Sequence, residues 1–267
     1  FKLECQVIDR NPDFQMEGRD YLRRIDWAKH TVRVGEKEYP LQFRQLQLDG
    51  TLLKRILLIG VPAGLQMVTF DLSNTLIQSG INSFGAVVIA AWTAYGKIDA
   101  FIWMISGAFG VAITTFVGQN FGAQRYDRVR SSVRVCLGMS VGTVGLLSLV
   151  LLLLRRQILG IYTADLGVVE TGAYMMAIIM PFEVIFMPVE IFAGTFRGVG
   201  DSVKPTVITC FCVCVVRMIW LMTAVRLHHT LFMLCVCYPM TWILAAAVFI
   251  VEYLKGDWLK KRMGGTV

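Results

Sequence analysis

The sequence has 267 residues, of which 55% are hydrophobic and 17% are charged, and its mean hydropathy is +0.59. Soluble domains average about 45–50% apolar and about 25% charged residues, so this composition excludes a soluble enzyme, a disordered chain and a disulfide-stapled secreted domain. The formal net charge of +7 does not point to nucleic acid, because membrane proteins collect Lys and Arg in their cytoplasmic loops. The composition predicts an integral membrane protein.

Residues 1–50 form a polar segment of mixed charge. Residues 1–55 hold 11 of the 26 basic and 9 of the 19 acidic side chains. We interpret residues 1–50 as a cytoplasmic linker or loop, in which the alternation from Thr31 to Phe43 predicts a short β-hairpin. The chain begins with Phe1 and shows no signal peptide there, so a fragment or a processed product is expected.

Six apolar segments follow Gly50, at roughly 54–83, 86–119, 129–154, 167–196, 204–226 and 230–253. A helix needs about 20 residues to cross the ~30 Å hydrocarbon layer, so each segment is long enough to span a membrane. Backbone groups in lipid must form their hydrogen bonds within the protein, which favours helices. The sequence therefore predicts an all-α polytopic membrane protein, with a six-helix transmembrane bundle over residues 51–262 and a C-terminal tail at 263–267.

Basic residues separate the two sets of loops. One set, including both termini, carries Arg44, Lys54, Arg55, Arg125, Arg128, Arg130, Arg134, Arg197, Lys204, Lys255, Lys260, Lys261 and Arg262. The opposite loops hold Arg155, Arg156 and Arg226. Because basic residues accumulate on the cytoplasmic side, both termini are predicted to be cytoplasmic.

The seven cysteines give no sign of a metal site, since five of them lie in apolar runs at spacings that do not suit zinc. The sequence also lacks a catalytic triad, a P-loop and a dinucleotide-binding fingerprint, which argues against an enzyme and against a bound cofactor.

Ionisable residues inside the apolar segments are the candidate functional residues, because a charge near the bilayer centre costs at least ~2.5–3.5 kcal/mol. Polar side chains form one helical stripe from Asp71 to Asn82 and a second from Tyr95 to Ser106, and Glu183 shares a face with Glu190. We expect these faces to turn toward one another or toward water. The predicted cation-coupling and substrate cavity comprises Asp71, Asn74, Gln78, Asp99, Glu183, Glu190 and Arg217.

Two plainer interpretations stay open for these residues. Neutral polar side chains also hold membrane helices together, and Arg217 could neutralise Glu183 or Glu190 in a static ion pair. Pro181 and Pro188 are expected to kink the helix that carries the two glutamates, since each removes a backbone N–H.

Three different short motifs lie near the ends of the apolar segments. They read Gly60-Val61-Pro62-Ala63-Gly64-Leu65-Gln66, then Thr115-Phe116-Val117-Gly118-Gln119-Asn120-Phe121-Gly122-Ala123-Gln124, then Gly194-Thr195-Phe196-Arg197-Gly198-Val199-Gly200-Asp201. Their glycines favour a structural role, in close backbone approach or at helix ends.

Together the motifs resemble the second half of the multidrug and toxic compound extrusion (MATE) family, over about residues 45–262. The resemblance implies one six-helix lobe of a twelve-helix antiporter in the cell membrane, which exports drug-like organic compounds, often cationic, in exchange for Na⁺ or H⁺. It implies a first lobe missing from this chain, or a second copy, as the partner. The family motif residues here are Gly118, Gln119, Gly122, Ala123, Arg197, Gly198 and Asp201.

The acidic positions that the family implies are only partly matched. They fall on Phe70, next to Asp71, and near Phe186, between Glu183 and Glu190. The coupling ion is therefore open. The alternatives are a lipid-linked polysaccharide flippase of the same superfamily, or an orphan lobe from a truncated gene that transports nothing.

Overall fold

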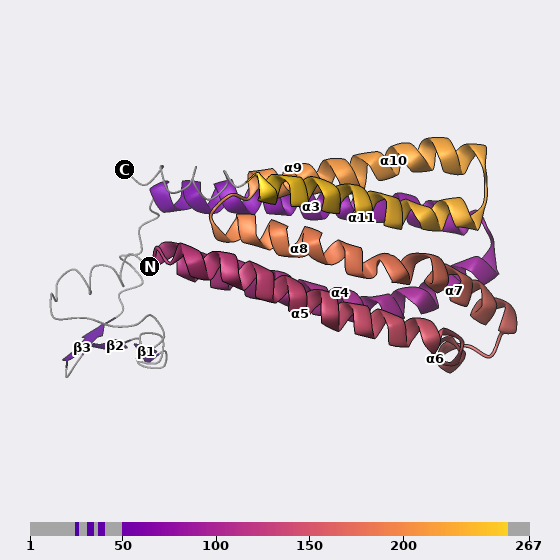
Figure 1. Cartoon of the computed structure of the whole chain (residues 1–267), viewed down its shortest axis with the longest axis horizontal. Coiled ribbons are helices and arrows are strands. Elements are labelled where there is room, and N and C mark those ends of the chain that lie inside the picture. Colours follow the sequence, from indigo (N-terminus) through magenta and orange to yellow (C-terminus); the bar gives the residue numbers. More distant parts are fainter. Residues whose placement is uncertain (1–24, 27–30, 35–36, 41–49, 256–267) are drawn as a thin grey trace. The chain divides into compact units, whose positions relative to one another are not determined.

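The computed structural model describes residues 25–26, 31–34, 37–40 and 50–255, and its contacts divide the chain into two units, Phe1–Leu58 and Ile59–Val267 (Figure 1). In the first unit, β1 (Ile25–Asp26), β2 (Thr31–Val34) and β3 (Lys37–Pro40) form an antiparallel sheet in that order. Val32 pairs with Tyr39 across the β2–β3 hairpin, so the predicted hairpin is confirmed. The rest of the predicted linker and the 263–267 tail lie outside the described residues.

The remainder of the described chain is helical. Its elements are α3 (Gly50–Asn82), α4 (Ala86–Gly122), α5 (Tyr126–Leu153), α6 (Arg155–Tyr162), α7 (Leu166–Ile179), η2 (Met180–Phe182), α8 (Glu183–Gly198), α9 (Val203–Thr209), η3 (Cys210–Val215), α10 (Val216–Trp220), η4 (Leu221–Val225) and α11 (Leu231–Leu254). Six helical stretches among the described residues are long and apolar enough to cross a membrane: Ile56–Asn82, Ala86–Gly122, Tyr126–Leu153, Leu166–Gly198, Val203–Val225 and Leu231–Leu254. The predicted six-span fold class is confirmed.

Two of the six spans are irregular. The fourth span is broken by the 3₁₀ turn η2, which contains Pro181 and ends immediately before Glu183. A proline cannot donate the helical hydrogen bond at its own position, which accounts for the break. Pro188 lies inside α8 without ending that helix. The fifth span contains two π-helical stretches, η3 and η4, which the sequence did not predict.

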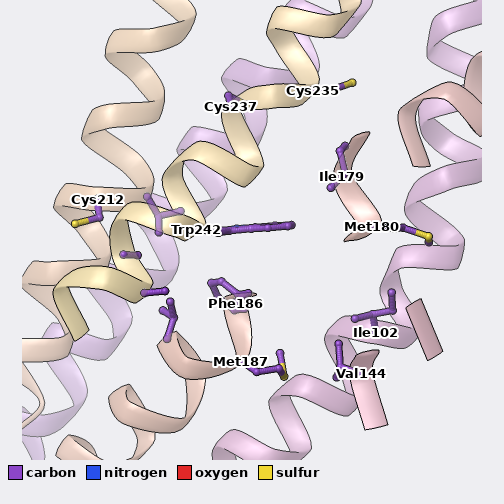
Figure 2. Packing of buried hydrophobic residues seen from close by; sticks show 14 of the residues in the cluster. Ile102, Val144, Ile179, Met180, Phe186, Met187, Cys212, Cys235, Cys237 and Trp242 are labelled. Carbon is purple, nitrogen blue, oxygen red and sulfur yellow. The ribbon is translucent and has the colours of Figure 1, made fainter. Parts of the chain in front are cut away.

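Helix α8 lies at the centre of the bundle. It packs against α4, α5 and α11, and Figure 1 shows it between the α4–α5 pair and α11. Side chains from Ile191 to Phe196 are all buried, so this helix has no face free for lipid over that stretch. Figure 2 shows Trp242 of α11 extending toward Ile179 and Met180, with Phe186 of α8 beside it. The Phe186 and Trp242 rings lie 5.7 Å apart.

Glycines bring α4 and α8 into close contact. A Cβ atom on Gly194 would lie 2.9 Å from the carbonyl oxygen of Gly110, and one on Gly198 would lie 2.8 Å from that of Thr114. The Thr114 hydroxyl is 2.7 Å from the Gly110 carbonyl oxygen and 3.1 Å from that of Gly194, so it bridges the two helices. Small residues allow this approach in membrane bundles, where helices associate by packing and hydrogen bonding.

Candidate functional site: a carboxyl pair beside a cavity

Two acidic side chains meet between α4 and α8. Glu183, the first residue of α8, is 1% exposed and lies close enough to the half-buried Asp99 carboxyl group for the two to interact electrostatically. The Tyr95 hydroxyl donates to Asp99 Oδ1 over 3.1 Å, and Trp103 Nε1 donates to Asp99 Oδ2 over 2.9 Å. Glu183 Oε1 has no hydrogen-bond partner. We call Asp99 and Glu183 the carboxyl pair.

The local sequence places this pair at one level of the bundle. Tyr95, Asp99 and Trp103 are four residues apart, so they follow one another along the α4 face that packs on α8. Gly110 is eleven residues beyond Asp99 and returns to the same face, where a Cβ atom would overlap the Glu190 carboxylate. The two glutamates of α8 therefore meet the same face of α4, at two different depths.

Arg217 of α10 lies in an aromatic setting and not in an ion pair. It is 1% exposed, donates from Nη2 to Thr241 Oγ1 over 3.2 Å, and places its guanidinium carbon 4.3 Å from the centre of the Tyr238 ring. Its Nε has no partner. Within the described part of the chain, Glu190 pairs with Arg197 at 3.3 Å, and no carboxylate forms an ion pair with Arg217. The predicted static pair of Arg217 with a glutamate is not formed.

Tyr238 connects Arg217 with the carboxyl pair. Tyr238 interacts electrostatically with both Arg217 and Asp99. Its ring also lies 5.6 Å from that of Trp242 and 5.9 Å from that of Trp92. The Arg217 guanidinium therefore lies against a cluster of aromatic rings that comprises Tyr238, Trp242 and Trp92.

A cavity of about 650 Å³ opens among α3, α4, α8 and α9. Its charged lining comes from Asp71, Glu190 and Arg197. Its aromatic lining comes from Phe70, Trp103 and Phe186, and polar side chains such as Gln66, Thr114, Thr115 and Thr209 complete it. Trp103 links the cavity with the carboxyl pair, because its side chain lines the cavity and its indole N–H donates to Asp99.

The structure divides the predicted site residues into groups. Asp99 and Glu183 form the carboxyl pair, Asp71 and Glu190 line the cavity, and Arg217 lies apart from both. Phe70 and Phe186, the positions where the family resemblance implies acids, both line the cavity. No pattern in the sequence singles out Tyr238, because a ring packed on a guanidinium from another helix leaves no signal in a single sequence.

The polar stripe of α3 lies only partly at the cavity. Asn74 is exposed, and Gln78 donates to its own helix neighbour Asn82 over 2.9 Å. The buried side chains of α3 are Ser73, Ile77 and Ile81, at four-residue spacing. Packing of this row against the bundle turns Asn74 and Gln78 away from the cavity, and only Asp71 reaches it.

The two loop motifs shape helix ends. Gly200 has φ of +83°, a conformation that favours glycine, and the Asp201 Oδ1 atom accepts from the backbone N–H of Lys204 over 3.2 Å. At the other motif, the backbone N–H of Ala123 donates to the carbonyl oxygen of Gln119 over 3.1 Å and closes α4. Gly118 faces the Gly198 carbonyl oxygen, whereas the space around Gly122 is open.

The six-helix fold and the glycine motifs agree with a known family of membrane transporters. A sequence model of the MatE family matches residues 62–223, which is more than half of the chain, and the chain therefore belongs to the MatE family. A separate model, described as Firmicute fructose-1,6-bisphosphatase, matches residues 1–49.

Relatives support the same assignment. The probable multidrug resistance protein YoeA of Bacillus subtilis is 27% identical over 187 residues, covering 68% of this chain and 40% of that protein. The probable multidrug resistance protein NorM of Aromatoleum aromaticum is 28% identical over 160 residues, covering 60% of this chain and 35% of NorM. Their names agree with the prediction of a transport protein and not an enzyme.

Solved structures share the fold. The crystal structure of the Vibrio cholerae MATE transporter VcmN in the bent form matches with a TM-score of 0.70 at 18% identity, covering 83% of this chain and 50% of VcmN. The chain spans about half the length of that structure and about two fifths of YoeA. It corresponds to part of such a transporter, as the predicted lobe requires.

Proposed function

We propose that residues 51–262 form one lobe of a secondary active antiporter, which exports organic cations while protons move inward. The observation that carries this proposal is the carboxyl pair. Two acids close together inside a membrane-spanning bundle, Glu183 buried and Asp99 half-buried, are expensive to keep and serve structure poorly, since apolar residues would pack there without that cost. The MatE family relationship supports a transport role for them.

A proton suits the carboxyl pair better than Na⁺. Both oxygens of Asp99 already accept hydrogen bonds, from the Tyr95 hydroxyl and the Trp103 indole N–H. An indole N–H has no lone pair to offer a cation, and a hard cation needs several oxygen ligands. One proton placed between the Asp99 and Glu183 carboxyl groups turns their repulsion into a hydrogen bond.

Proton release would then move α8. Loss of the shared proton leaves two carboxylates in contact, and their repulsion pushes the start of α8 away from α4. The 3₁₀ turn η2 immediately precedes Glu183, so the first residue of α8 adjoins a break in the helix. Such a break lets α8 shift without dragging α7, which is the kind of two-state element that alternating access needs.

The cavity suits an organic cation. Its volume of about 650 Å³ lies within the range of small-molecule sites. Phe70, Trp103 and Phe186 offer aromatic faces to a cation, and Asp71 offers a negative charge. Because Trp103 also holds Asp99, a ligand that shifts this ring would disturb the carboxyl pair. That contact would couple substrate and proton.

The cavity does not favour the flippase alternative. A lipid-linked, anionic substrate calls for several basic side chains, and the lining here supplies Arg197, which is paired with Glu190. Lys97 is exposed, with its Nζ 5.7 Å from the centre of the Tyr162 ring, and Arg217 is buried elsewhere. A transport assay distinguishes the antiporter from the orphan-lobe alternative. A lone lobe would remain a monomer in detergent and would move no substrate.

We further propose that the transporter lies in the cell membrane with the Arg-rich ends of its helices in the cytoplasm. A first lobe, or a second copy of this one, would complete it. The partner would cover the exposed polar stripe of α3 around Asn74, which lipid would not tolerate.

The test is drug efflux from vesicles that hold the full-length transporter, driven by an imposed pH gradient or an imposed Na⁺ gradient. Glu183→Gln and Asp99→Asn keep the side-chain size and remove the exchangeable proton. Each is expected to lower pH-driven efflux at least tenfold while the protein stays folded. Glu170→Gln is the matched control, because Glu170 is exposed and pairs with Arg156 at 2.8 Å.

Glu190→Gln separates coupling from substrate binding. Glu190 lines the cavity, so this variant should weaken binding of cationic drugs and still respond to the pH gradient. Undiminished pH-driven efflux by the Glu183→Gln/Glu190→Gln double variant would refute the coupling role. Efflux that responds to the Na⁺ gradient alone would overturn the choice of ion.

A further inference from the structure

A second hollow, a groove of about 420 Å³, lies between α4 and α5. On α4 it is lined by apolar side chains, among them Phe109, Ala112 and Phe116. On α5 its lining changes along the helix, from Arg128, Ser131 and Ser132 near the start to Val135 and Met139 further in. The groove is thus polar and basic at one end and apolar over the rest of its length.

The groove is separate from the substrate cavity. Successive helical residues are about 100° apart, so Phe109, Ala112 and Phe116 point to one side of α4, while Gly110 and Thr114, which line the cavity, point to nearly the opposite side. Phe116, Val135 and Met139 are 46%, 57% and 58% exposed. Within the described chain, the groove opens outward, away from the carboxyl pair.

The length of the groove matches one leaflet of a bilayer. Arg128 is three residues from the turn that joins α4 to α5, at the shared end of two helices that are apolar enough to span a membrane. Met139 is eleven residues further along, which is about 16 Å at 1.5 Å per residue. That is about half of the ~30 Å hydrocarbon thickness. Phe109 of α4 lies level with Cys136 of α5, because the Cys136 Sγ atom is 4.0 Å from the Phe109 carbonyl oxygen.

We propose that this groove is a binding site for one anionic phospholipid from the leaflet on the Arg-rich side. The Arg128 guanidinium and the Ser131 hydroxyl would bind the headgroup phosphate, and one acyl chain would lie along Val135 and Met139, opposite Phe109 and Ala112. A soluble anion would leave the apolar length unfilled. An apolar drug would leave a guanidinium without a counter-charge. An amphiphile with an anionic head satisfies both ends.

The site can be tested with the purified full-length transporter in lipid nanodiscs of equal parts phosphatidylglycerol and phosphatidylcholine with identical acyl chains. Native mass spectrometry then counts the lipids that stay bound after mild release. Arg128→Gln is expected to lower retained phosphatidylglycerol about fivefold, as one basic residue near an anionic lipid should. Arg130→Gln is the control, since Arg130 is exposed on the same turn of α5 but points away from the groove.

The apolar part of the groove is tested by filling it. Ala112→Trp should reduce retention of both lipids; if that variant fails to fold, Ala112→Leu gives the same test with less added volume. Equal retention of the two lipids by the unmodified protein would overturn the proposal, and so would equal losses in Arg128→Gln and Arg130→Gln. Retention unchanged by a folded Ala112 variant would show that the acyl chain does not lie here.

Discussion

Arg217 shows how a single side chain can carry a charge inside this membrane protein without an ion pair. Its guanidinium lies over the Tyr238 ring, and one hydrogen bond goes to Thr241. A cation over an aromatic face gains about 2 kcal/mol when the contact is desolvated.

The first prediction concerns this ring. Tyr238→Leu removes the aromatic face beneath Arg217 and should lower the free energy of unfolding by about 2 kcal/mol. Tyr238→Phe keeps the ring and should cost less than about 1 kcal/mol. Thermal unfolding in detergent, followed for both variants, measures the difference. Equal losses would mean that the Arg217 charge is balanced by something other than the Tyr238 ring.

At the scale of the helices, α8 is the central helix, because it packs against α4, α5 and α11. Its two acids and its proline, Pro188, can be read from the sequence, and so can the hairpin at Thr31–Pro40. The break at η2 follows from Pro181, and the six spans follow from runs of apolar residues. These are local properties, set by hydropathy and by single backbone positions.

The sequence does not show in the same way which helix faces contact one another. Periodicity placed Tyr95, Asp99 and Trp103 on one stripe, but the contact with Glu183 depends on how closely α4 and α8 pack. That closeness comes from Gly194 and Gly198 together with Gly110, which lie far apart in the chain. The orientation of α3 also depends on packing between helices. The row Ser73, Ile77 and Ile81 packs inward, and Asn74 does not.

The second prediction tests the close contact between α4 and α8. Gly198→Ala places a Cβ atom 2.8 Å from the Thr114 carbonyl oxygen, so the helices must separate, at about 1–3 kcal/mol. Gly122→Ala is the matched control, because nothing lies within 4 Å of the added atom and alanine favours the helix. We expect Gly198→Ala to lower the folded yield and the unfolding temperature, and Gly198→Leu and Gly118→Leu to lower the yield further.

Size-exclusion profiles of tagged variants extracted in detergent give the yield, and efflux assays give the substrate profile. A Gly198→Leu protein that folds normally and exports a different set of drugs would show that this position contacts the ligand, contrary to the packing argument.

At the scale of the whole molecule, the chain combines two units with different relationships. The MatE match begins at residue 62, close to the division between Leu58 and Ile59, and the bisphosphatase-like match ends at residue 49. The helical unit has two distinct ends. Ser83 and His229 are joined at one end by a 2.8 Å hydrogen bond, and Gly118 faces Gly198 near the other.

The last prediction uses this arrangement to fix the orientation. The end that includes residues 123–125, 199–202 and 255 carries Arg125, Arg128, Arg130, Arg134, Arg197, Lys204 and Lys255, whereas the end near His229 carries Arg155, Arg156 and Arg226. Because basic residues are retained in the cytoplasm, the Arg125 end should be cytoplasmic and the His229 end external. In a variant without native cysteines, His228→Cys should react in intact cells with a membrane-impermeant maleimide, and Gln124→Cys should react at least tenfold faster after the cells are opened. Labelling of both positions from outside would refute the six-span topology, since three spans, an odd number, lie between Gln124 and His228 and place them on opposite sides of the membrane.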